Sequence, residues 1–376
     1  MLNIIEVTNN KDFFNLRDEW NELVLNSESN NIFLAWEWLF NWWTSFNKEK
    51  KLKILLLREN DELIGIAPLF LCKSKRKNTY QIRFMGSTDV GSDYLDFISK
   101  KGSENEVINE IFKYLNLNKD NWQIINLTDI PSKSESIGLM KKHYDSNYYT
   151  LIQKYTTCPY LPLPESHEIF LSSLSSNMRY NIKRKRRKFE QELKGQFIVV
   201  REKNEIHELY EEMVRLNLNR MKIKKIDSPF NNKSFYQFHK NIISYFVAND
   251  WLRLCFLKIK GYYIASLYIF KYGGKYYYYQ SGFDPDWEKL SPGFLLFSYC
   301  IENAISEGIK EFDFLQGEEE YKYLWTNKTR TNLNVKVYRK FFRNGIRYMV
   351  EKNKPIVKSK IRTLFLSVNL KDLIFL

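Results

Sequence analysis

The sequence has 376 residues, of which 44% are hydrophobic, 16% aromatic and 27% charged, with only 14 glycines and 9 prolines. This composition excludes a disordered or fibrous chain and predicts a globular protein of two or three domains with an ample core. The net charge of +14 favours an anionic partner, such as a nucleotide sugar, coenzyme A, a nucleic acid or a membrane surface.

The cysteines and the N-terminal residues bear on the cellular compartment. The cysteines at positions 72, 158, 255 and 300 lie far apart without a CxxC pair, so the sequence indicates neither a zinc site nor a disulfide framework. The first residues lack the pattern of a signal peptide, and no apolar run approaches the ~18 residues of a membrane span. We therefore expect a cytoplasmic protein without a bound metal.

Residues 1–155 are predicted to form a first α/β domain. The pattern predicts a strand at 4–7, helices at 13–25 and 35–46, and paired strands at 52–58 and 62–71. Tryptophans at positions 36, 38, 42 and 43 crowd the second helix. Helical spacing places most of them in the core, which leaves one, with Trp36 as the candidate, to line a cleft for a sugar ring or an acyl chain.

A polar, glycine-rich segment from Gly86 to Asp96 follows a strand predicted at 81–85. We expect it to form a loop at the end of that strand. A carboxylate such as Asp93 can take a proton from an attacking amine or hydroxyl, but aspartates are also common in turns. Both interpretations of Asp93 stay open on the sequence.

The prolines at 159, 162 and 164 predict an extended crossing into a second domain, residues 156–345. Its first helix, beginning near Ser175, carries seven cations within residues 179–188. Because like charges repel, an anionic ligand or partner would stabilise this helix, and a solvated basic face explains it equally well. A further amphipathic helix is predicted at 205–220.

Residues 275–325 hold the densest set of chemically useful positions. The pattern predicts a strand at 276–280, an Asp/Pro loop, a helix from Ser291, a strand at 311–315 and a small helix around 321–325. Ser291 as a cap, proline at the first helical position and an unobstructed Gly293 suit either phosphate oxygens or an ordinary well-capped helix.

The final segment, residues 346–376, alternates basic with aliphatic side chains. This pattern predicts a basic amphipathic helix, which lies either on an anionic membrane or over the parent fold. We prefer packing on the fold. Binding of this helix to lipid would place the protein peripherally at the inner face of the membrane.

A family resemblance is carried by six stretches: FLAWEWLFNWW, LIGIAPLF, YLPLPESHEIFLSSLSSNMRYNIKRKRRK, YYYYQSGFDP, LSPGFLL and GIKEFDFLQGEEEYKYLW. Together they resemble the acetyltransferases of the cellulose-biosynthesis (CelD/BcsL) type within the GNAT superfamily, over roughly residues 30–340. This group is similar to the Fem-type aminoacyltransferases. The resemblance implies an α/β (α+β) fold of two tandem GNAT-like domains, each with a mixed, mostly antiparallel sheet flanked by helices.

The resemblance also implies roles for particular residues. Catalytic roles fall to Asp93, Asp313 and Lys322, and Asp93 with Asp96 resembles the acidic pair beside the acceptor cleft of Fem-type enzymes. We expect Asp313 and Lys322 to meet, either as an ion pair that fastens the last helix or with Asp313 orienting Lys322 toward a phosphate or an oxyanion. The donor is expected at Gly282, Ser291, Gly293 and Phe294, and the acceptor at Trp36, Arg184, Arg187, Arg220, Tyr279 and Tyr321.

Two departures from the family pattern leave questions open. A Leu-His-x-x-Arg pattern is Leu216-Asn217-Leu218-Asn219-Arg220 in this chain, so the arginine is present and the histidine is not. The Gln/Arg-x-x-Gly-x-Gly/Ala signature of the donor site is absent. The donor is therefore expected to be acetyl-CoA or another acyl-CoA, with aminoacyl-tRNA as the alternative.

The sequence thus predicts an N- or O-acyltransferase that acts by direct transfer on an anionic or sugar-containing acceptor in envelope or exopolysaccharide assembly. The first alternative is a Fem-like, aminoacyl-tRNA-dependent transferase or an RNA-binding protein that grips RNA with the helix at 179–188. The second is a non-catalytic subunit of a polysaccharide complex, anchored by its tail.

Overall fold

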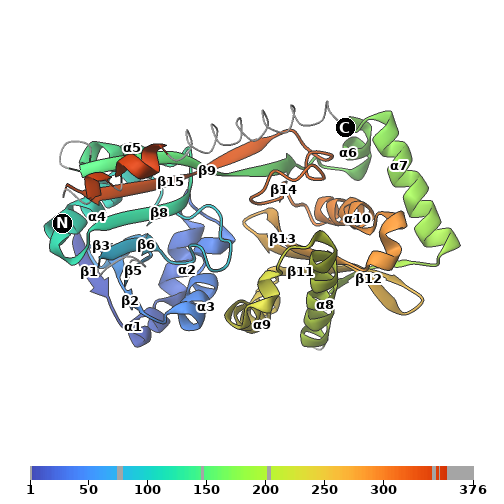
Figure 1. The fold of residues 1–376 in the computed structure, drawn as a ribbon, viewed down its shortest axis with the longest axis horizontal. Helices are drawn as coiled ribbons and strands as arrows, with labels where there is room; N and C mark the ends of the chain where they lie inside the picture. The colour runs from blue at the N-terminus through green and yellow to red at the C-terminus, as the bar shows by residue number, and fades with distance from the viewer. Residues whose placement is uncertain are drawn as a thin grey trace, which may run out of the picture.

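The computed structural model describes residues 2–73, 79–144, 148–200, 205–340, 344–346 and 348–353. Figure 1 shows two halves side by side, each a sheet with helices on its faces. Most of the tail that the sequence predicts as an amphipathic helix lies outside the described residues, so its predicted packing on the fold or on a membrane stays a prediction.

In the described residues of the first half, one strand and three α-helices come first, and six strands, a fourth helix, one more strand and a last helix follow, with two short 3-10 helices among them. These are β1 (Asn3–Val7), α1 (Asn10–Asn15), α2 (Arg17–Leu25), η1 (Ile32–Leu34), α3 (Trp36–Phe46), β2 (Lys50–Leu52), β3 (Ile54–Glu59), β4 (Glu62–Ala67), β5 (Leu69–Lys73), β6 (Tyr80–Phe84), β7 (Ile98–Ser99), α4 (Glu104–Leu117), η2 (Lys119–Asn121), β8 (Ile124–Pro131) and α5 (Glu135–Tyr144).

The second half follows a long strand, β9 (Tyr148–Pro162), and ends in another, β15 (Thr329–Arg339). Between them come α6 (His167–Ser173), α7 (Ser176–Arg187), η3 (Lys188–Glu192), β10 (Gln196–Val200), α8 (Ile206–Lys224), η4 (Pro229–Asn231), α9 (Lys233–Ala248), β11 (Leu252–Ile259), β12 (Tyr262–Tyr272), β13 (Lys275–Phe283), η5 (Pro285–Leu290), α10 (Pro292–Ser306) and β14 (Glu311–Asp313).

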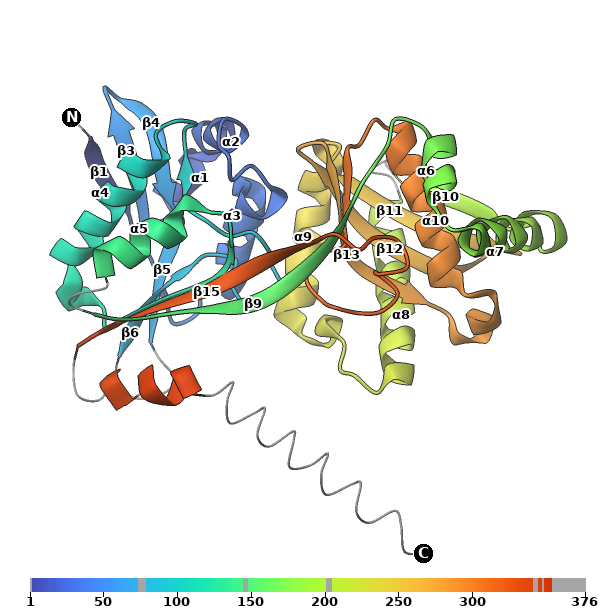
Figure 2. The same cartoon turned by 90° about the horizontal axis from the view of Figure 1, so that it is seen from above.

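Strands β9 and β15 join strands of both halves into one sheet, whereas β1, β3, β4 and β7 of the first half form a separate four-stranded sheet. Strands β9 and β15 pair with each other along their lengths, β14 of the second half pairs with the end of β9, and β8 of the first half pairs with β15. An 11-stranded sheet results, in the order β10-β11-β12-β13-β14-β9-β15-β8-β6-β5-β2, and Figure 2 shows the two long strands running across both halves. The predicted domain boundary at residue 155 falls inside β9.

Apolar packing continues across the contact between the halves. Trp38 of α3 lies with its ring centroid 4.9 Å from that of Phe238 on α9 and 5.6 Å from that of Phe270 on β12. One buried cluster contains all three residues, which explains why α3 is apolar on nearly every side. Burial of such large rings is worth ~2 kcal/mol or more each, so the halves are held as one body.

The loop between β6 and β7, residues 85–97, reaches from the first half onto the second. The Tyr94 hydroxyl donates to Asp313 Oδ2 at 2.8 Å, and Asp93 Oδ2 accepts from the backbone N–H of Gln316 at 3.0 Å. The loop needs left-handed backbone at Gly86, Thr88, Gly91 and Tyr94, which accounts for its glycines. The loop follows the end of β6, as predicted, and from there it reaches the second half.

Two local predictions in the second half are wrong. The small helix predicted around 321–325 is a succession of turns. Ser291 does not cap α10 with its side chain, because its backbone is left-handed, with φ of 54°, and the hydroxyl lies elsewhere. The predicted start of α10 and the predicted strands on either side of it are confirmed, with β13 three residues longer at its end than expected and β14 two residues shorter.

Candidate functional site

The two parallel strands β13 and β14 pair over only three residues and then separate. Tyr277 pairs with Asp313, and no pair follows. Strand β14 ends there because Asp313 Oδ1 accepts the Leu315 N–H at 2.8 Å and Leu315 takes a left-handed conformation. A cavity of ≈ 230 Å³ lies beyond this divergence, lined by Arg220, Lys224, Ser266, Leu267, Ser281, Gly282, Phe283, Gly293, Phe294, Phe297, Tyr321, Leu324 and Trp325.

The start of α10 forms one wall of the cavity. Its first intrahelical bond runs from the Leu295 N–H to the Ser291 carbonyl, so the amides of Gly293 and Phe294 precede it and point away from the helix body. A Cβ atom on Gly293 would meet nothing within 4 Å. The helix start is thus open to a ligand, and its partial positive charge favours an anion.

Lys185 of α7 fixes the loop before α10. Its Nζ donates to Ser291 Oγ at 3.0 Å and to the Leu290 carbonyl at 3.3 Å. The basic helix α7 therefore lies next to the open helix start. Lys185 belongs to the run of cations at 179–188, but nothing in its spacing distinguishes it from its neighbours.

A β-bulge in β13 sets which side chains face α10. Tyr268 of β12 pairs with Gln280 and Ile269 with Tyr278, so Tyr279 has no partner on β12. The extra residue shifts the alternation of the strand, and Tyr278 and Ser281 come to lie on the same face. The sequence pattern gives no sign of this bulge.

Three hydroxyls form a chain at the cavity wall because of that bulge. The Tyr278 hydroxyl lies 2.6 Å from Ser281 Oγ and 3.2 Å from the Tyr321 hydroxyl. The pKa of Tyr321 is raised mainly by burial and to a smaller extent by the neighbouring Tyr278 hydroxyl, so this phenol keeps its proton at neutral pH. The chain can therefore supply a proton to an atom in the cavity.

Gly282 is required by close packing of α8. A Cβ atom on Gly282 would lie 2.2 Å from the backbone nitrogen of Asn217, a clash with main chain. Asn217 Nδ2 in turn donates to the Ser281 carbonyl at 2.8 Å, while its Oδ1 accepts from Ser228 Oγ at 2.8 Å. Asn217, at the position where the resemblance leads us to expect a histidine, thus fastens α8 to β13.

Asp93 holds the two halves together and does not line the cavity. Its Oδ1 accepts from Asn332 Nδ2 at 2.9 Å, and its Oδ2 accepts the Gln316 N–H. The side chain is fully buried, and burial, reinforced by the carboxyl of Asp129, raises its pKa well above the usual range. Its catalytic role stays a prediction.

Asp313 and Lys322 do not form the predicted ion pair. Asp313 Oδ2 accepts from Arg330 at 3.0 Å, whereas Lys322 pairs with Glu319 at 2.9 Å. Lys322 also donates to the Gln316 carbonyl at 2.7 Å, which closes the turn after β14. Both side chains are buried, and neither is among the residues that line the cavity.

Of the other predicted site residues, Arg220, Tyr321, Gly282, Gly293 and Phe294 line the cavity. Arg184 and Arg187 are exposed on α7.

Trp36 and Tyr279 are placed in the core instead. Trp36 is buried in the first half, with its indole N–H donating to the Phe13 carbonyl at 2.9 Å. The Tyr279 hydroxyl lies 3.0 Å from His239 Nε2 and donates to the Val90 carbonyl. The cavity therefore brings together three of the four predicted donor residues, all but Ser291, and two of the predicted acceptor residues.

Asp129 is a buried carboxyl that sequence reasoning missed. It sits at an irregularity of β8 with φ of 64°, and its Oδ1 has no hydrogen-bond partner among the described residues. Burial raises the pKa of Asp129 to about 7 and that of Asp96 to about 6. A single aspartate in a strand-like pattern gives no signal by which this position could have been found.

These raised pKa values predict how stability depends on pH. The folded protein holds protons that the unfolded chain, with carboxyl pKa values near ~3.9, releases. We expect the free energy of unfolding to be greatest at about pH 4 and to fall as the pH rises toward about 7. Asparagine tolerates the left-handed backbone at this position. Asp129→Asn should therefore raise the free energy of unfolding by about 2 kcal/mol at pH 8 and make it less dependent on pH. Urea unfolding at several pH values tests this, and an unchanged slope would contradict it.

Within the described residues, no group of three or more His, Cys, Asp or Glu side chains is arranged to hold a metal ion. A search of the same residues for a helix with the length and apolarity to cross a bilayer finds none.

Comparison with known proteins finds one family model that matches part of the second half. Residues 176–323 match the model of an acetyltransferase (GNAT) domain. No curated protein matches the sequence of the chain.

Solved structures share the fold at low identity. FemX is 10% identical, with a TM-score of 0.62 over 88% of this chain and 96% of FemX. A conserved protein of unknown function from Bacteroides thetaiotaomicron VPI-5482 is 11% identical, with a TM-score of 0.56 over 90% of this chain and 100% of that one. L-PGS from Bacillus licheniformis is 11% identical, with a TM-score of 0.53 over 89% and 96%.

The predicted fold class is confirmed. Mixed sheets flanked by helices make up both halves, and the second half matches the GNAT domain. The first half repeats its arrangement, because β6 and β8 are parallel neighbours on either side of the α4 crossover, as β13 and β14 are around α10.

Proposed function

Since residues 176–323 match the model of an acetyltransferase (GNAT) domain, we propose that the protein transfers an acyl group, in the first instance acetyl, from acyl-CoA to an amine or hydroxyl. The open start of α10 beside the divergence of β13 and β14 is the observation that carries this proposal. Measuring the transfer of labelled acetyl from acetyl-CoA to an amino sugar by the purified full chain tests it.

The cavity fits the reactive end of such a donor. Its volume of ≈ 230 Å³ suits an acyl group with the end of a pantetheine arm, and its walls include the rings of Phe294, Phe297 and Trp325. The amides of Gly293 and Phe294 are placed to hold phosphate oxygens at the mouth. Arg220 and Lys224 of α8 add positive charge to the lining of the cavity.

Acyl-CoA supplies the thioester whose carbonyl carbon is attacked. The chain supplies the geometry: α10 and the bulge of β13 fix the donor, and the backbone at the bulge offers hydrogen-bond donors outside the ladder. The new bond to the acceptor forms as the carbon–sulfur bond breaks, and the Tyr321 hydroxyl gives its proton to the departing sulfur. Ser281 and Tyr278 then relay a proton from water in the cavity to Tyr321, which balances the proton that the acceptor loses to water.

In this scheme the acceptor gives its own proton to water. No aspartate, glutamate or histidine is among the described residues that line the cavity. The acceptor therefore attacks as a neutral amine or hydroxyl, and the rate should rise with pH through the pKa of an amine acceptor. The mechanism needs no covalent intermediate on the enzyme.

A sugar-containing acceptor in envelope or exopolysaccharide assembly is part of the proposal. It is supported by the resemblance of six stretches of the sequence to acetyltransferases of the cellulose-biosynthesis type. A cytoplasmic enzyme, with or without a peripheral membrane contact through residues 346–376, fits such a role. Arg184 and Arg187 would then hold an anionic acceptor.

Aminoacyl-tRNA is the second candidate donor, and one observation favours it. Four cations of the helix and its continuation, Lys183, Arg184, Arg187 and Lys188, are exposed next to the loop that Lys185 fixes. A nucleic acid backbone would neutralise such a group, and its binding would weaken steeply with salt. Native mass spectrometry of the freshly purified protein distinguishes a retained acyl-CoA from a retained RNA.

The exposed arginines of α7 should affect anion binding without affecting stability. Arg184→Gln together with Arg187→Gln is expected to weaken binding of the anionic acceptor about 10-fold, while exposed charges of this kind contribute only ~0 to 1 kcal/mol to folding. Titration of the acceptor by calorimetry, with thermal melting as the check on folding, measures both.

Arg186 provides the contrast. It pairs with Glu302, and its guanidinium lies 4.1 Å from the centroid of the Tyr299 ring. Arg186→Gln should therefore lower the melting temperature and leave the affinity for the acceptor unchanged. Equal affinity in the double variant and the unmodified protein would exclude Arg184 and Arg187 from the acceptor site.

A further inference from the structure

The first half contains a second cavity, which lies at the start of α4 and the end of β8. Beyond the parallel pairs of β6 with β8, at Ile82 and Ile125, these strands also separate. A cavity of ≈ 550 Å³ is bounded there by residues before α4, by the first turns of α4 and by residues after β8. Its lining includes Phe97, Ser99, Glu104, Ile108, Pro131, Ser134 and Ser136, together with Tyr277 and Arg330 from the other half.

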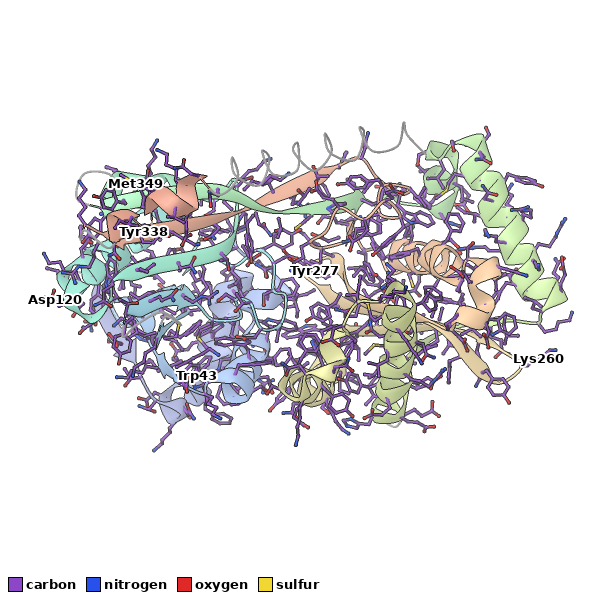
Figure 3. The ribbon with its side chains drawn as sticks, in the orientation of Figure 1. Trp43, Asp120, Lys260, Tyr277, Tyr338 and Met349 are labelled. Atoms are coloured by element: carbon purple, nitrogen blue, oxygen red, sulfur yellow. The ribbon has the colours of Figure 1, made fainter. Side chains whose placement is uncertain are left out.

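This cavity is separate from the proposed donor site. Tyr277 lines the cavity of the first half, and Ser281 lines the donor cavity of the second half. These residues are four positions apart on β13, and four residues span about 13 Å along a strand. Tyr279, between them along β13, is partly buried, and its hydroxyl lies 3.0 Å from His239 Nε2. Figure 3 shows Tyr277 in the middle of the molecule, between the halves.

The charges at the first-half cavity are opposite to those of a phosphate site. Helix α4 carries Glu104 and Glu106 in its first turn, where α10 has the uncharged Pro292 and Phe294. Four carboxyl groups line the cavity: Glu28, Asp96, Glu104 and Glu135.

Two of the three cations that line this cavity are already paired. Lys275 lies 3.4 Å from Glu311, and Arg330 binds Glu311 and Asp313. Only Lys133 has no acidic partner in the described part of the chain. An anionic ligand would be repelled here, and a cationic one attracted.

Polar atoms with no partner show that the cavity is equipped for a ligand. The Tyr277 hydroxyl and Ser99 Oγ, in side chains that are 1% and 3% exposed, have no hydrogen-bond partner among the described residues, and neither has Asn30 Oδ1. All three residues line the cavity. A buried polar group left unpaired is costly, so a ligand that donates to Asn30 and accepts from Tyr277 would relieve the cost.

From these observations we propose that the first-half cavity binds a small hydroxylated amine of the amino-sugar class. Its ammonium group lies among Asp96, Glu104 and Glu135, and its hydroxyls pair with Tyr277 and Ser99. The volume of ≈ 550 Å³ accommodates one or two sugar rings. The proposal does not require the second half to be active, because it concerns binding alone.

Calorimetric titration of the full chain with glucosamine at pH 7.5 tests this inference. We expect saturable binding of glucosamine, weaker binding of glucose and no binding of glucose 6-phosphate. Tyr277→Phe and Ser99→Ala should each weaken the binding of glucosamine about 5- to 10-fold, as the loss of one hydrogen bond does. Neither hydroxyl makes a hydrogen bond within the described part of the protein, so the melting temperatures of both variants should match that of the unmodified protein.

Tyr144→Phe is the matched control. The Tyr144 hydroxyl is likewise buried without a partner in the described residues, but it does not line this cavity. This variant should bind glucosamine as the unmodified protein does. The proposal is overturned by the absence of saturable glucosamine binding, by unchanged affinity in Tyr277→Phe, or by tighter binding of glucose 6-phosphate than of glucosamine.

Discussion

A Gly293→Glu variant is expected to lose about 100-fold or more in kcat/KM for acyl-CoA while folding normally. The new side chain meets no atom within 4 Å at its Cβ, so the substitution causes no clash. A carboxylate near the start of a helix is favourable to the helix, but it occupies the place of the donor's phosphates and repels them. A loss of ~2.7 kcal/mol in transition-state binding corresponds to that factor of 100.

Gly138→Glu provides the control for Gly293→Glu. Gly138 lies in α5, and its Cβ position is also free of contacts. Gly138→Glu therefore introduces the same charge on a helix away from the donor cavity, and the kinetics of this variant should match those of the unmodified protein. Steady-state kinetics over a range of acetyl-CoA concentrations distinguish the two variants. Full activity in Gly293→Glu would remove the start of α10 from the donor site.

Arg330→Met should reduce the free energy of unfolding by about 3 to 5 kcal/mol. Arg330 of β15 binds Glu311 and Asp313 of β14, and Asp313 is fully buried. Loss of the guanidinium leaves the Asp313 carboxylate inside the protein without its cationic partner, which is the costly case for a buried ion pair. Burial already raises the pKa of Asp313, and Arg330 is the group that counters it most.

Urea denaturation at pH 7 measures this effect, and a second substitution identifies its cause. Adding Asp313→Asn to Arg330→Met should recover part of the loss, because no buried charge is then left unpaired. Arg58→Met breaks an ion pair with Glu19 that is largely exposed and should cost less than ~1 kcal/mol. A loss from Arg330→Met no larger than that from Arg58→Met would show that the network contributes little.

The position of this network matters for the whole molecule. Tyr94 from the first half donates to the same carboxyl of Asp313 that Arg330 binds. Asp93, one residue earlier, binds the turn that Lys322 closes. The three residues predicted as catalytic, Asp93, Asp313 and Lys322, therefore lie together, but they connect the two halves and do not line the donor cavity. They set the shape of the turn that carries Tyr321.

Local sequence patterns fixed the elements around the site. Proline after Ser291 and the apolar run that follows placed the start of α10, and the aromatic run before Ser281 placed β13. The crowding of tryptophans in α3 indicated burial, which the structure shows for all four. These signals succeed because proline geometry and apolar periodicity act within one element.

Contacts between distant segments could not be predicted in the same way. The pairing of Asp313 with Arg330 instead of Lys322 depends on β15 lying beside β9, next to β14. The meeting of Tyr278, Ser281 and Tyr321 depends on a bulge that one extra residue in β13 creates. Neither the order of strands in a sheet nor a bulge has a reliable counterpart in spacing along the chain.

The sequence by itself determined the α/β class, the helix start that suits an anionic ligand, the basic face of α7 and the family resemblance, because each follows from residues within a few turns of one another. Only the tertiary structure decided that Asp93 and Lys322 support the joint, that Arg220 and Tyr321 face the cavity, and that the first half carries a second cavity of opposite charge. The reason is that side chains from both halves, more than 200 positions apart, meet there, as Asp93 and Gln316 do.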